Sequence, residues 1–498
     1  MKTWNSALLK ERAFDCVRGF ERRAGSGGLW NYHDSHAGPE PVTGPSLDPH
    51  SPDLVKPCRL AANHYVWPSA IYELLDTNVP RQIMEYSGFP FPKDTPLFPT
   101  KQQVLDYMKR YAKDVEPHIR FNTNVVSVRY RPNEEKKWLV TYRPVCDETE
   151  GGLKFSAAHP DKTEHFDAVL VASGHYELPY VPEKKGLAEW TAKYPGSVSH
   201  SKHFRHPRQF ADVPGNLLIV GNSASALDLA YQTAVILQRN VYKSARSQAT
   251  LPGGSSEYIK TVPDIDRLEP ETRSVRFTDG SVLHDVGHVL FATGFLRHYP
   301  FLDEINRTAT PVVTDGLRLH GLYKQCVSYN FPGLAFIATP RYILPTRVGE
   351  AQAVWLSKIF QGKLELHSIE EMKADEENTV QLRGDSPKFH NLMYPDDVHY
   401  AHELNRHVYS TPGWQSGLLP CEWNREDILY RASAVKMKEA YLKYRERTNG
   451  KRAASVEELQ QTVGFKFEDV DWTEFKLRVA QDPRRVLENV PPLGSAAR

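Results

Sequence analysis

Three short apolar runs in this chain each end at a glycine. They read DAVLVASG (167–174), NLLIVG (216–221) and HVLFATG (288–294). Continuous apolar runs of this length are typical of strands that are buried on both faces of a parallel sheet. The sequence therefore predicts an α/β fold.

The second run is followed by a predicted helix. Residues 222–238 read NSASALDLAYQTAVILQ, with apolar residues at helical spacing and neither Gly nor Pro. A strand, a tight turn of small residues and a helix form the first half of a βαβ unit. Small residues let the backbone approach a pyrophosphate, and the N-terminus of the helix offers unpaired N–H groups to it. The turn is therefore a candidate dinucleotide site, and a simple strand-to-helix turn is the alternative.

The next predicted strand indicates which coenzyme would bind. The chain reads VYKSAR at 241–246. In an NAD site this strand normally ends in an acid that binds the ribose hydroxyls, whereas Lys243, Ser244 and Arg246 suit the 2′-phosphate of NADP. The sequence favours NADP, and exposed basic residues at a strand end are the alternative interpretation.

A second dinucleotide-type half near the N-terminus is incomplete. Residues 5–11 indicate the end of a helix and 16–20 a strand, after which Glu21 suits the ribose diol of FAD. The usual distance from a glycine turn to this acid is about 20 residues, and counting back from Glu21 reaches Met1. We expect either that the sequence begins too late or that the protein is a variant with a damaged flavin site.

Local patterns predict several further elements. Thr100 and Gln103 form a capping box at the start of a helix over 100–112. The other predicted elements are strands of a small meander at 121–129 and 138–143, a proline-rich surface loop at 38–57, and a helix with a solvated Lys/Glu-rich face at 435–452.

Composition excludes several classes of function. The 498 residues allow two to four domains. Lys+Arg 62 against Asp+Glu 61 leaves no basic footprint for nucleic acid or an anionic membrane. No stretch approaches the roughly 18 uncharged apolar residues of a membrane span, so we expect a soluble, cytoplasmic protein. The five scattered cysteines contain no CxxC pair, which argues against a disulfide framework, a metal site or a redox dithiol.

The order of short motifs resembles that of the flavin-containing monooxygenases. These motifs are FERRAGSGGLW (20–30), DTNVP (76–80), GFPFP (88–92), YPGSVSHSKHF (194–204), GNSASALDLA (221–230) and FATGF (291–295). The fourth is similar to the family fingerprint FxGxxxHxxx(Y/F), with Tyr194 in the first place. Arg205 follows it, as in the monooxygenases rather than the Baeyer–Villiger enzymes. The likeness covers about residues 7–405 and looks closest to fungal members.

The resemblance implies two Rossmann-like dinucleotide-binding domains, with the NADP domain inserted in the FAD domain and a small β-meander. We place the first, N-terminally incomplete part of the FAD domain at 1–178. The NADP domain follows at 179–296. The second part of the FAD domain and a helical C-terminal region occupy 297–498.

The implied activity is an NADPH-dependent oxygenation. NADPH would reduce FAD, O2 would add to give a flavin C4a-hydroperoxide, and a nitrogen or sulfur nucleophile of a small molecule would take one oxygen atom. The implied partners are this substrate and O2, without nucleic acid or membrane, and a homodimer is possible. The alternatives are a Baeyer–Villiger or N-hydroxylating enzyme of the same superfamily, and an NADP-binding pseudoenzyme with impaired FAD binding.

The resemblance also implies roles for individual residues. Asn78 would be the catalytic residue, its amide bonding near the flavin and NADP and limiting the loss of H2O2, and the alternative is that it only caps a helix. His200 is predicted to pack or to fix a loop rather than to act as a base. The implied FAD-binding residues are Glu21, Gly28, Leu29 and Trp30, with Thr77 and Asn78 facing both cofactors. The implied NADP-binding residues are Gly221, Ser223, Ser225, Ala226, Asp228, Ser244 and Arg246.

Overall fold

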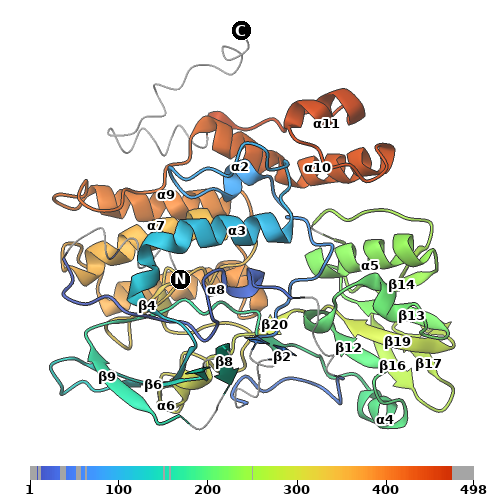
Figure 1. Cartoon of the computed structure of the whole chain (residues 1–498), viewed down its shortest axis with the longest axis horizontal. Helices are drawn as coiled ribbons and strands as arrows, with labels where there is room; N and C mark the ends of the chain where they lie inside the picture. The colour runs from blue at the N-terminus through green and yellow to red at the C-terminus, as the bar shows by residue number, and fades with distance from the viewer. Residues whose placement is uncertain are drawn as a thin grey trace.

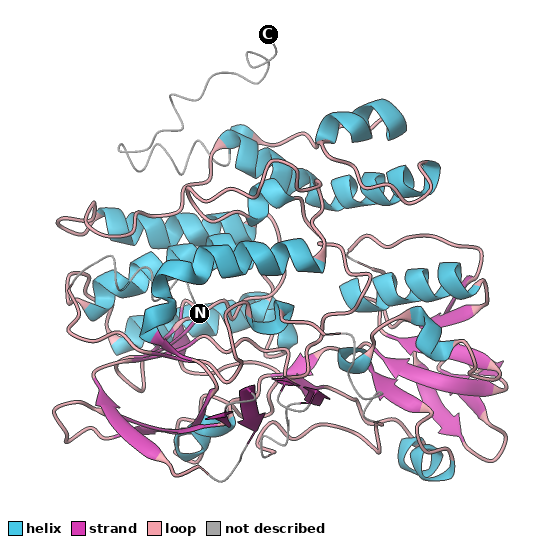
Figure 2. Cartoon of the chain, in the orientation of Figure 1, coloured by secondary structure: helices cyan, strands magenta, loops and turns pink. Residues whose placement is uncertain are grey.

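The computed structural model describes residues 13–33, 41–51, 58–61, 64–149, 152–155, 159–249 and 251–473, together with Leu8. The predicted helix end at 5–11 lies outside the described residues except for Leu8, and the predicted loop at 38–57 is described only in part. Figure 1 shows a sheet-centred unit on the right and a helix-rich region on the left and top, and Figure 2 shows the same division by secondary structure.

The sheet-centred unit contains five parallel strands in the order β12-β19-β13-β14-β15. Their bounds are β12 (Val198–His200), β13 (Asn216–Val220), β14 (Val241–Ser244), β15 (Ile259–Val262) and β19 (Val286–Phe291). The predicted strands at 216–221 and 288–294 are thus confirmed as β13 and β19. All six residues of β19 are buried, as expected for a strand covered on both faces.

The two faces of this sheet are covered by different layers. In β13, Leu217 and Ile219 pack with helix α5 (Ala224–Leu237), whereas Leu218 and Val220 pack on the opposite side. This alternation follows from the two-residue period of a strand. The opposite layer comprises α4 (Leu187–Lys193) and the antiparallel strands β16 (Ile265–Glu269), β17 (Ser274–Phe277) and β18 (Val282–Leu283).

The remaining strands form smaller sheets in the other half of the molecule. Two parallel pairs matter for the site: β1 (Gly19–Phe20) with β4 (Ile119–Arg120), and β10 (Val169–Val171) with β23 (Leu334–Phe336). The predicted meander is confirmed as β5 (Thr123–Tyr130) and β6 (Trp138–Pro144), which continue into β9 (Lys162–Phe166). The other strands are β2 (Cys58–Ala61), β3 (His64–Val66), β7 (Cys146–Thr149), β8 (Gly152–Phe155), β21 (Leu322–Tyr323) and β22 (Val327–Ser328).

A two-stranded junction joins the two halves. Strand β11 (Leu178–Pro179) pairs antiparallel with β20 (Phe295–Leu296). The chain therefore enters and leaves the five-stranded unit at one place, close to the predicted boundaries at 178 and 296.

Helices cover the second half and form its largest core. Helix α7 (Pro345–Phe360) is buried from Thr346 to Lys358 and carries Trp355 into the core cluster. The other helices are α2 (Arg81–Met84), α3 (Lys101–Ala112), α6 (Asp303–Asn306), α8 (Ile369–Arg383), α9 (Asp396–Tyr409), α10 (Arg425–Arg447) and α11 (Val456–Val463). The capping box of Thr100 and Gln103 at the start of α3 is confirmed.

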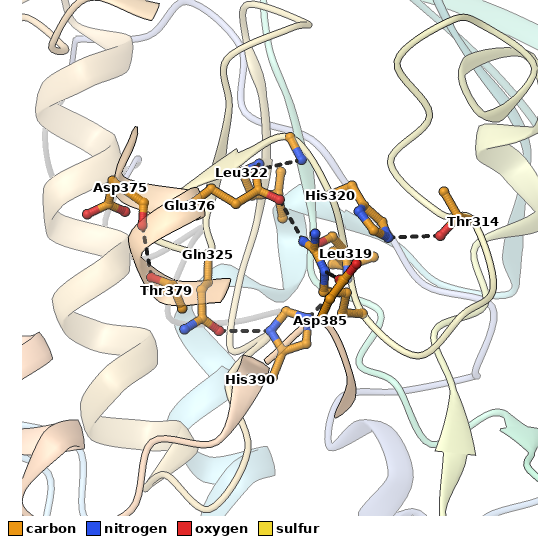
Figure 3. Close-up of polar contacts among 12 residues, drawn as sticks. Thr314, Leu319, His320, Leu322, Gln325, Asp375, Glu376, Thr379, Asp385 and His390 are labelled. Carbon is orange, nitrogen blue, oxygen red and sulfur yellow. Dashed lines mark hydrogen bonds and ion pairs between the residues drawn. The ribbon is translucent and has the colours of Figure 1, made fainter. Parts of the chain in front are cut away.

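Figure 3 shows a polar network around Glu376 of α8. The buried Glu376 carboxylate accepts hydrogen bonds from Arg318 Nη1 (2.6 Å) and from the backbone N–H groups of Gly321 (2.9 Å) and Leu322 (3.2 Å). Because a buried carboxylate is stable only when it is paired and hydrogen-bonded, this network anchors α8 to the β21–β22 hairpin.

The helix predicted at 435–452 belongs to α10, which runs from Arg425 to Arg447. Its predicted solvated face is present, because Lys436, Glu439 and Lys443 are exposed. The other side of the helix buries Met437, Lys438 and Tyr441, which the Lys/Glu pattern did not indicate.

Two further observations concern the described residues only. No described helix combines the length and the apolar character needed to cross a membrane. The described part of the chain also contains no group of three or more His, Cys, Asp or Glu side chains that could hold a metal ion.

Candidate dinucleotide and oxygenation site

The turn between β13 and α5 accepts only glycine at its first position. Gly221 has φ of +136°, and a Cβ there would lie 2.6 Å from the Ala292 carbonyl oxygen. Ser223 is the N-cap of α5, but its side chain makes no capping hydrogen bond. The N–H groups of the first helical turn therefore receive no acceptor from the N-cap side chain, and these donors fit a pyrophosphate.

The predicted residues that follow along α5 have different surroundings. Ser225 is exposed and Ala226 is buried beneath the turn. The Asp228 carboxylate accepts hydrogen bonds from the Tyr72 hydroxyl and from Gln232 Nε2, the latter at 2.9 Å. Burial raises the pKa of Asp228. Asp228 thus connects α5 to the segment that leads into the DTNVP motif.

The three residues predicted for the 2′-phosphate, at the end of β14, have different surroundings. The Ser244 hydroxyl is buried and donates to the Pro263 carbonyl oxygen at 2.8 Å. Lys243 Nζ donates to Asn222 Oδ1 at 2.6 Å. The Arg246 side chain is exposed, so its guanidinium is accessible from solvent.

The predicted flavin loop follows β1 and is held by a neighbouring segment. Glu21 Oε1 accepts the backbone N–H of Arg23 at 2.9 Å, and the Arg23 guanidinium donates to the carbonyl oxygens of Trp67 and Pro68, both at 2.9 Å. Gly28, Leu29 and Trp30 form the short 3-10 helix η1 (Gly28–Trp30), in which Trp30 is only partly buried. The Ser69 hydroxyl donates to the Leu29 carbonyl oxygen.

Glu177 joins this loop to two other parts of the chain. It follows β10 and pairs with Arg22 at 2.5 Å and with Lys202 Nζ at 2.7 Å. Burial opposes ionisation of Glu177, but Arg22 and Lys202 outweigh it and lower its pKa. The β1 loop, the carboxyl end of β10 and the YPGSVSHSKHF segment therefore meet at one carboxylate.

The DTNVP segment is fixed by the C-terminal helices. The buried Asp76 carboxylate accepts hydrogen bonds from Tyr441 Oη (3.1 Å), Arg445 Nη1 (3.0 Å) and Arg452 Nη2 (3.0 Å). Lys438 Nζ donates to the Thr77 carbonyl oxygen at 2.7 Å. We call these four α10 and post-α10 residues the C-terminal clamp, and no sequence motif indicated it.

Asn78 lies next to the clamped residues with its side chain exposed. The N-cap of α2 is Pro80, without a side-chain capping bond. The alternative interpretation, in which Asn78 only caps a helix, is therefore wrong. The Thr77 hydroxyl donates to the Val79 carbonyl oxygen at 2.9 Å and so shapes the turn that presents Asn78.

Lys438 also connects the two halves electrostatically. Burial lowers its pKa, while the charges of Asp228 and Asp76 act in the opposite direction. A second link runs from Tyr231 Oη on α5 to Glu446 on α10 at 3.1 Å. Helix α10 thus contacts both the five-stranded unit and the segment that carries Asn78.

His200 is buried, as expected for a packing residue. Its Nδ1 accepts the Lys202 backbone N–H at 3.1 Å, and its ring lies 5.2 Å from that of Phe295. Burial lowers the pKa of His200 to about 3. The neutral ring therefore holds the loop that places Lys202 against Glu177.

Comparison with known proteins identifies the family. A family model described as flavin-binding monooxygenase-like matches residues 59–251 and 256–419, which is more than half of the chain. The chain belongs to this family. The flavin-binding class agrees with the FAD and NADP cofactors expected from the sequence motifs.

Individual relatives support the same assignment for this flavin-binding monooxygenase-like protein. The thiol-specific monooxygenase of Saccharomyces cerevisiae is 28% identical over 381 residues, covering 74% of this chain and 80% of the relative. Flavin-containing monooxygenase FMO GS-OX-like 2 of Arabidopsis thaliana is 30% identical over 404 residues, covering 77% of each chain.

A solved structure shows the same fold. S-allyl-L-cysteine S-oxygenase from Allium sativum superposes with a TM-score of 0.65 and 22% identity, covering 98% of this chain and 96% of that chain. The predicted fold class is thereby confirmed. The C-terminal clamp lies beyond residue 419, where the family match ends.

Proposed function

We propose that this flavin-binding monooxygenase-like protein is an NADPH-dependent flavin monooxygenase that transfers one oxygen atom from O2 to a nitrogen or sulfur nucleophile of a small molecule. The observation that carries the proposal is the glycine-only turn at Gly221, which opens α5 beside the exposed Arg246. A turn of this kind binds the pyrophosphate, and an arginine at the next strand end suits the 2′-phosphate of NADP.

The proposed roles divide between the two halves. In the five-stranded unit, Gly221, Ser223, Ser225, Ala226 and Asp228 surround the NADP pyrophosphate, and Ser244 and Arg246 lie on the side of the 2′-phosphate. In the other half, Glu21 binds the FAD ribose, and Gly28, Leu29 and Trp30 line the flavin side. A bound flavin supplies the activation of O2.

Asn78 is the proposed catalytic residue, and Thr77 shapes its turn. The Asn78 amide is exposed and can face the cofactors. The C-terminal clamp fixes the backbone beside it, because Lys438 donates to the Thr77 carbonyl oxygen. An amide that donates to the cofactors at this place would orient them and limit the release of H2O2.

A sulfur nucleophile is the better supported substrate class. The relatives include a thiol-specific monooxygenase and an S-allyl-L-cysteine S-oxygenase. The cytoplasmic location, the homodimer and the domain boundaries stay predictions.

The test is a spectrum followed by turnover. The full chain is expressed with added FAD, purified, and scanned for the flavin band near 450 nm before and after NADPH is added without oxygen. We expect a yellow protein that NADPH bleaches at least tenfold faster than NADH, and that consumes NADPH in air when a thioether is supplied. A colourless protein that binds NADP+ but never oxidises NADPH would contradict the proposal and favour the pseudoenzyme.

A further inference from the structure

Basic side chains gather at a second place, where strands β10 and β23 end. These two strands are parallel, and their carboxyl ends lead into His175 and Arg341 respectively. Arg297 follows β20 and reaches the same loop as Arg341. Ligands of parallel sheets bind beyond the carboxyl ends of the strands, so this position suits a binding group.

Arg297 has an unused hydrogen-bond donor. Its side chain is buried, with 3% of the residue exposed, and its Nη2 donates to the Thr339 carbonyl oxygen at 2.6 Å. Its Nη1 is buried without a hydrogen-bond partner. The Tyr299 side chain interacts with the same guanidinium, and no carboxylate of the described residues does so. Buried charges are normally paired, so a guanidinium in this state is arranged for an anion.

Two further basic groups face the same region. His175 Nε2 is buried without a partner. Burial, followed by the charges of Arg297 and Arg341, lowers the pKa of His175. The partly exposed Arg341 guanidinium lies over the Tyr342 ring at 5.4 Å and forms no ion pair among the described residues. Glu177, the acid nearest to His175 in the sequence, already pairs with Arg22 and Lys202.

The loop that carries Arg341 is held in a strained shape. Ala338 and Tyr342 have φ of +49° and +62°, a region that residues other than glycine rarely adopt. The Arg341 backbone N–H donates to the His390 carbonyl oxygen at 2.7 Å. Figure 3 shows the His390 ring directed at Gln325, whose Oε1 lies 2.8 Å from Nδ1, while Nε2 accepts the Leu319 N–H at 3.0 Å. Both ring nitrogens of His390 are therefore used, and His390 supports the loop. Backbone of this kind clusters at active sites, ligand clamps and switch regions.

We propose that Arg297 and Arg341, with His175, bind an anionic oxygen group that belongs either to the substrate, as a carboxylate, or to a cofactor, as a phosphate. The inference rests on the proposed function for the identity of that ligand. Arg341 is the entry residue because it is partly exposed, and Arg297 is the inner residue because its free donor is buried.

The experiment compares wild type with Arg341→Gln, Arg341→Lys and the control Arg208→Gln, which removes an exposed arginine elsewhere. One arm measures the dissociation constants of FAD and of riboflavin, which lacks phosphate. The other measures KM and kcat for methylthioacetate and for its uncharged amide. Thermal unfolding checks that each variant is folded.

If the anion is a cofactor phosphate, Arg341→Gln weakens FAD about tenfold or more and leaves riboflavin unchanged. If it is a substrate carboxylate, Arg341→Gln raises KM for methylthioacetate by a similar factor, with kcat and the amide unaffected. Arg341→Lys retains part of the affinity in either case, and Arg208→Gln behaves as wild type. A folded Arg341→Gln protein that is unchanged in both arms overturns the proposal.

A failure of the proposed function is recognised separately. If wild type neither binds flavin nor oxidises NADPH, the site is tested by titrating inorganic pyrophosphate in the presence of saturating NADP+, which occupies the Gly221 turn. Saturable binding that weakens about tenfold in Arg341→Gln supports the anion site. Equal binding by wild type and Arg341→Gln, or none by either, overturns it.

Discussion

Replacing Gly221 with alanine is expected to weaken NADP+ binding roughly 10- to 100-fold. The new Cβ would lie 2.6 Å from the Ala292 carbonyl oxygen, which belongs to backbone and cannot swing away. The φ of +136° is also strained for any residue with a Cβ, at about 1–3 kcal/mol. The turn must shift, and α5 then loses at least one charge-assisted hydrogen bond to the pyrophosphate. Each such bond contributes about 1.5–3 kcal/mol, which gives the stated range.

Isothermal titration calorimetry of NADP+ into the full chain measures this effect without requiring flavin. The matched control is Gly44→Ala, where an added Cβ meets no heavy atom within 4 Å and φ is not positive. Thermal unfolding should show a loss of stability for Gly221→Ala and none for Gly44→Ala. A folded Gly221→Ala protein that binds NADP+ within twofold of wild type would refute the assignment of this turn.

Four other substitutions test separate parts of the site. Lys438→Met should lower the free energy of unfolding by about 1.5–3 kcal/mol and speed amide hydrogen exchange at residues 75–80. The control Lys443→Met, which replaces an exposed lysine of the same helix, should change neither quantity. Equal exchange in both variants would remove Lys438 from the clamp. Asn78→Ala should raise the H2O2 released per NADPH consumed, and an unchanged ratio would end its catalytic assignment. Arg246→Ala should weaken NADPH far more than NADH in steady-state kinetics, while equal losses would exclude the 2′-phosphate contact. Burial lowers the pKa of His200 from an ordinary 6.5 to about 3. Its contribution to the free energy of unfolding is therefore complete above pH 6.5 and is lost as the pH falls from 6.5 towards 3. In urea titrations, wild type should lose roughly 3 kcal/mol of unfolding free energy between neutral pH and pH 4 because of His200, and His200→Phe should not show this part of the loss. The same pH dependence in both proteins would contradict the buried neutral ring.

The parts of the fold that were predictable depend on local sequence. The Gly221 turn follows a buried strand and opens a helix within one continuous segment, so spacing alone located it. The capping box of Thr100 and Gln103 is equally local. In both cases the interacting residues lie within a few positions of one another, which is the range over which sequence patterns carry structural information.

The parts that were missed depend on contacts between distant residues. The Lys/Glu pattern at 435–452 indicated a solvated helix face but not the buried position of Lys438, whose partner, the Thr77 carbonyl oxygen, lies 361 positions away along the chain. The helix-cap alternative for Asn78 was wrong because α2 starts only after Pro80. Arg297 carried no motif at all, since an unpaired buried donor is visible only after the surrounding loops are placed.

The fate of molecular oxygen is the most direct test of the proposed activity. The full chain, supplied with FAD and NADPH, is incubated with a thioether under ¹⁸O-labelled O2, and the product is analysed by mass spectrometry. We predict a sulfoxide that carries one labelled oxygen atom and forms only when NADPH is present. Unlabelled sulfoxide, or labelled sulfoxide that forms equally without NADPH, would contradict flavin-dependent monooxygenation by this chain.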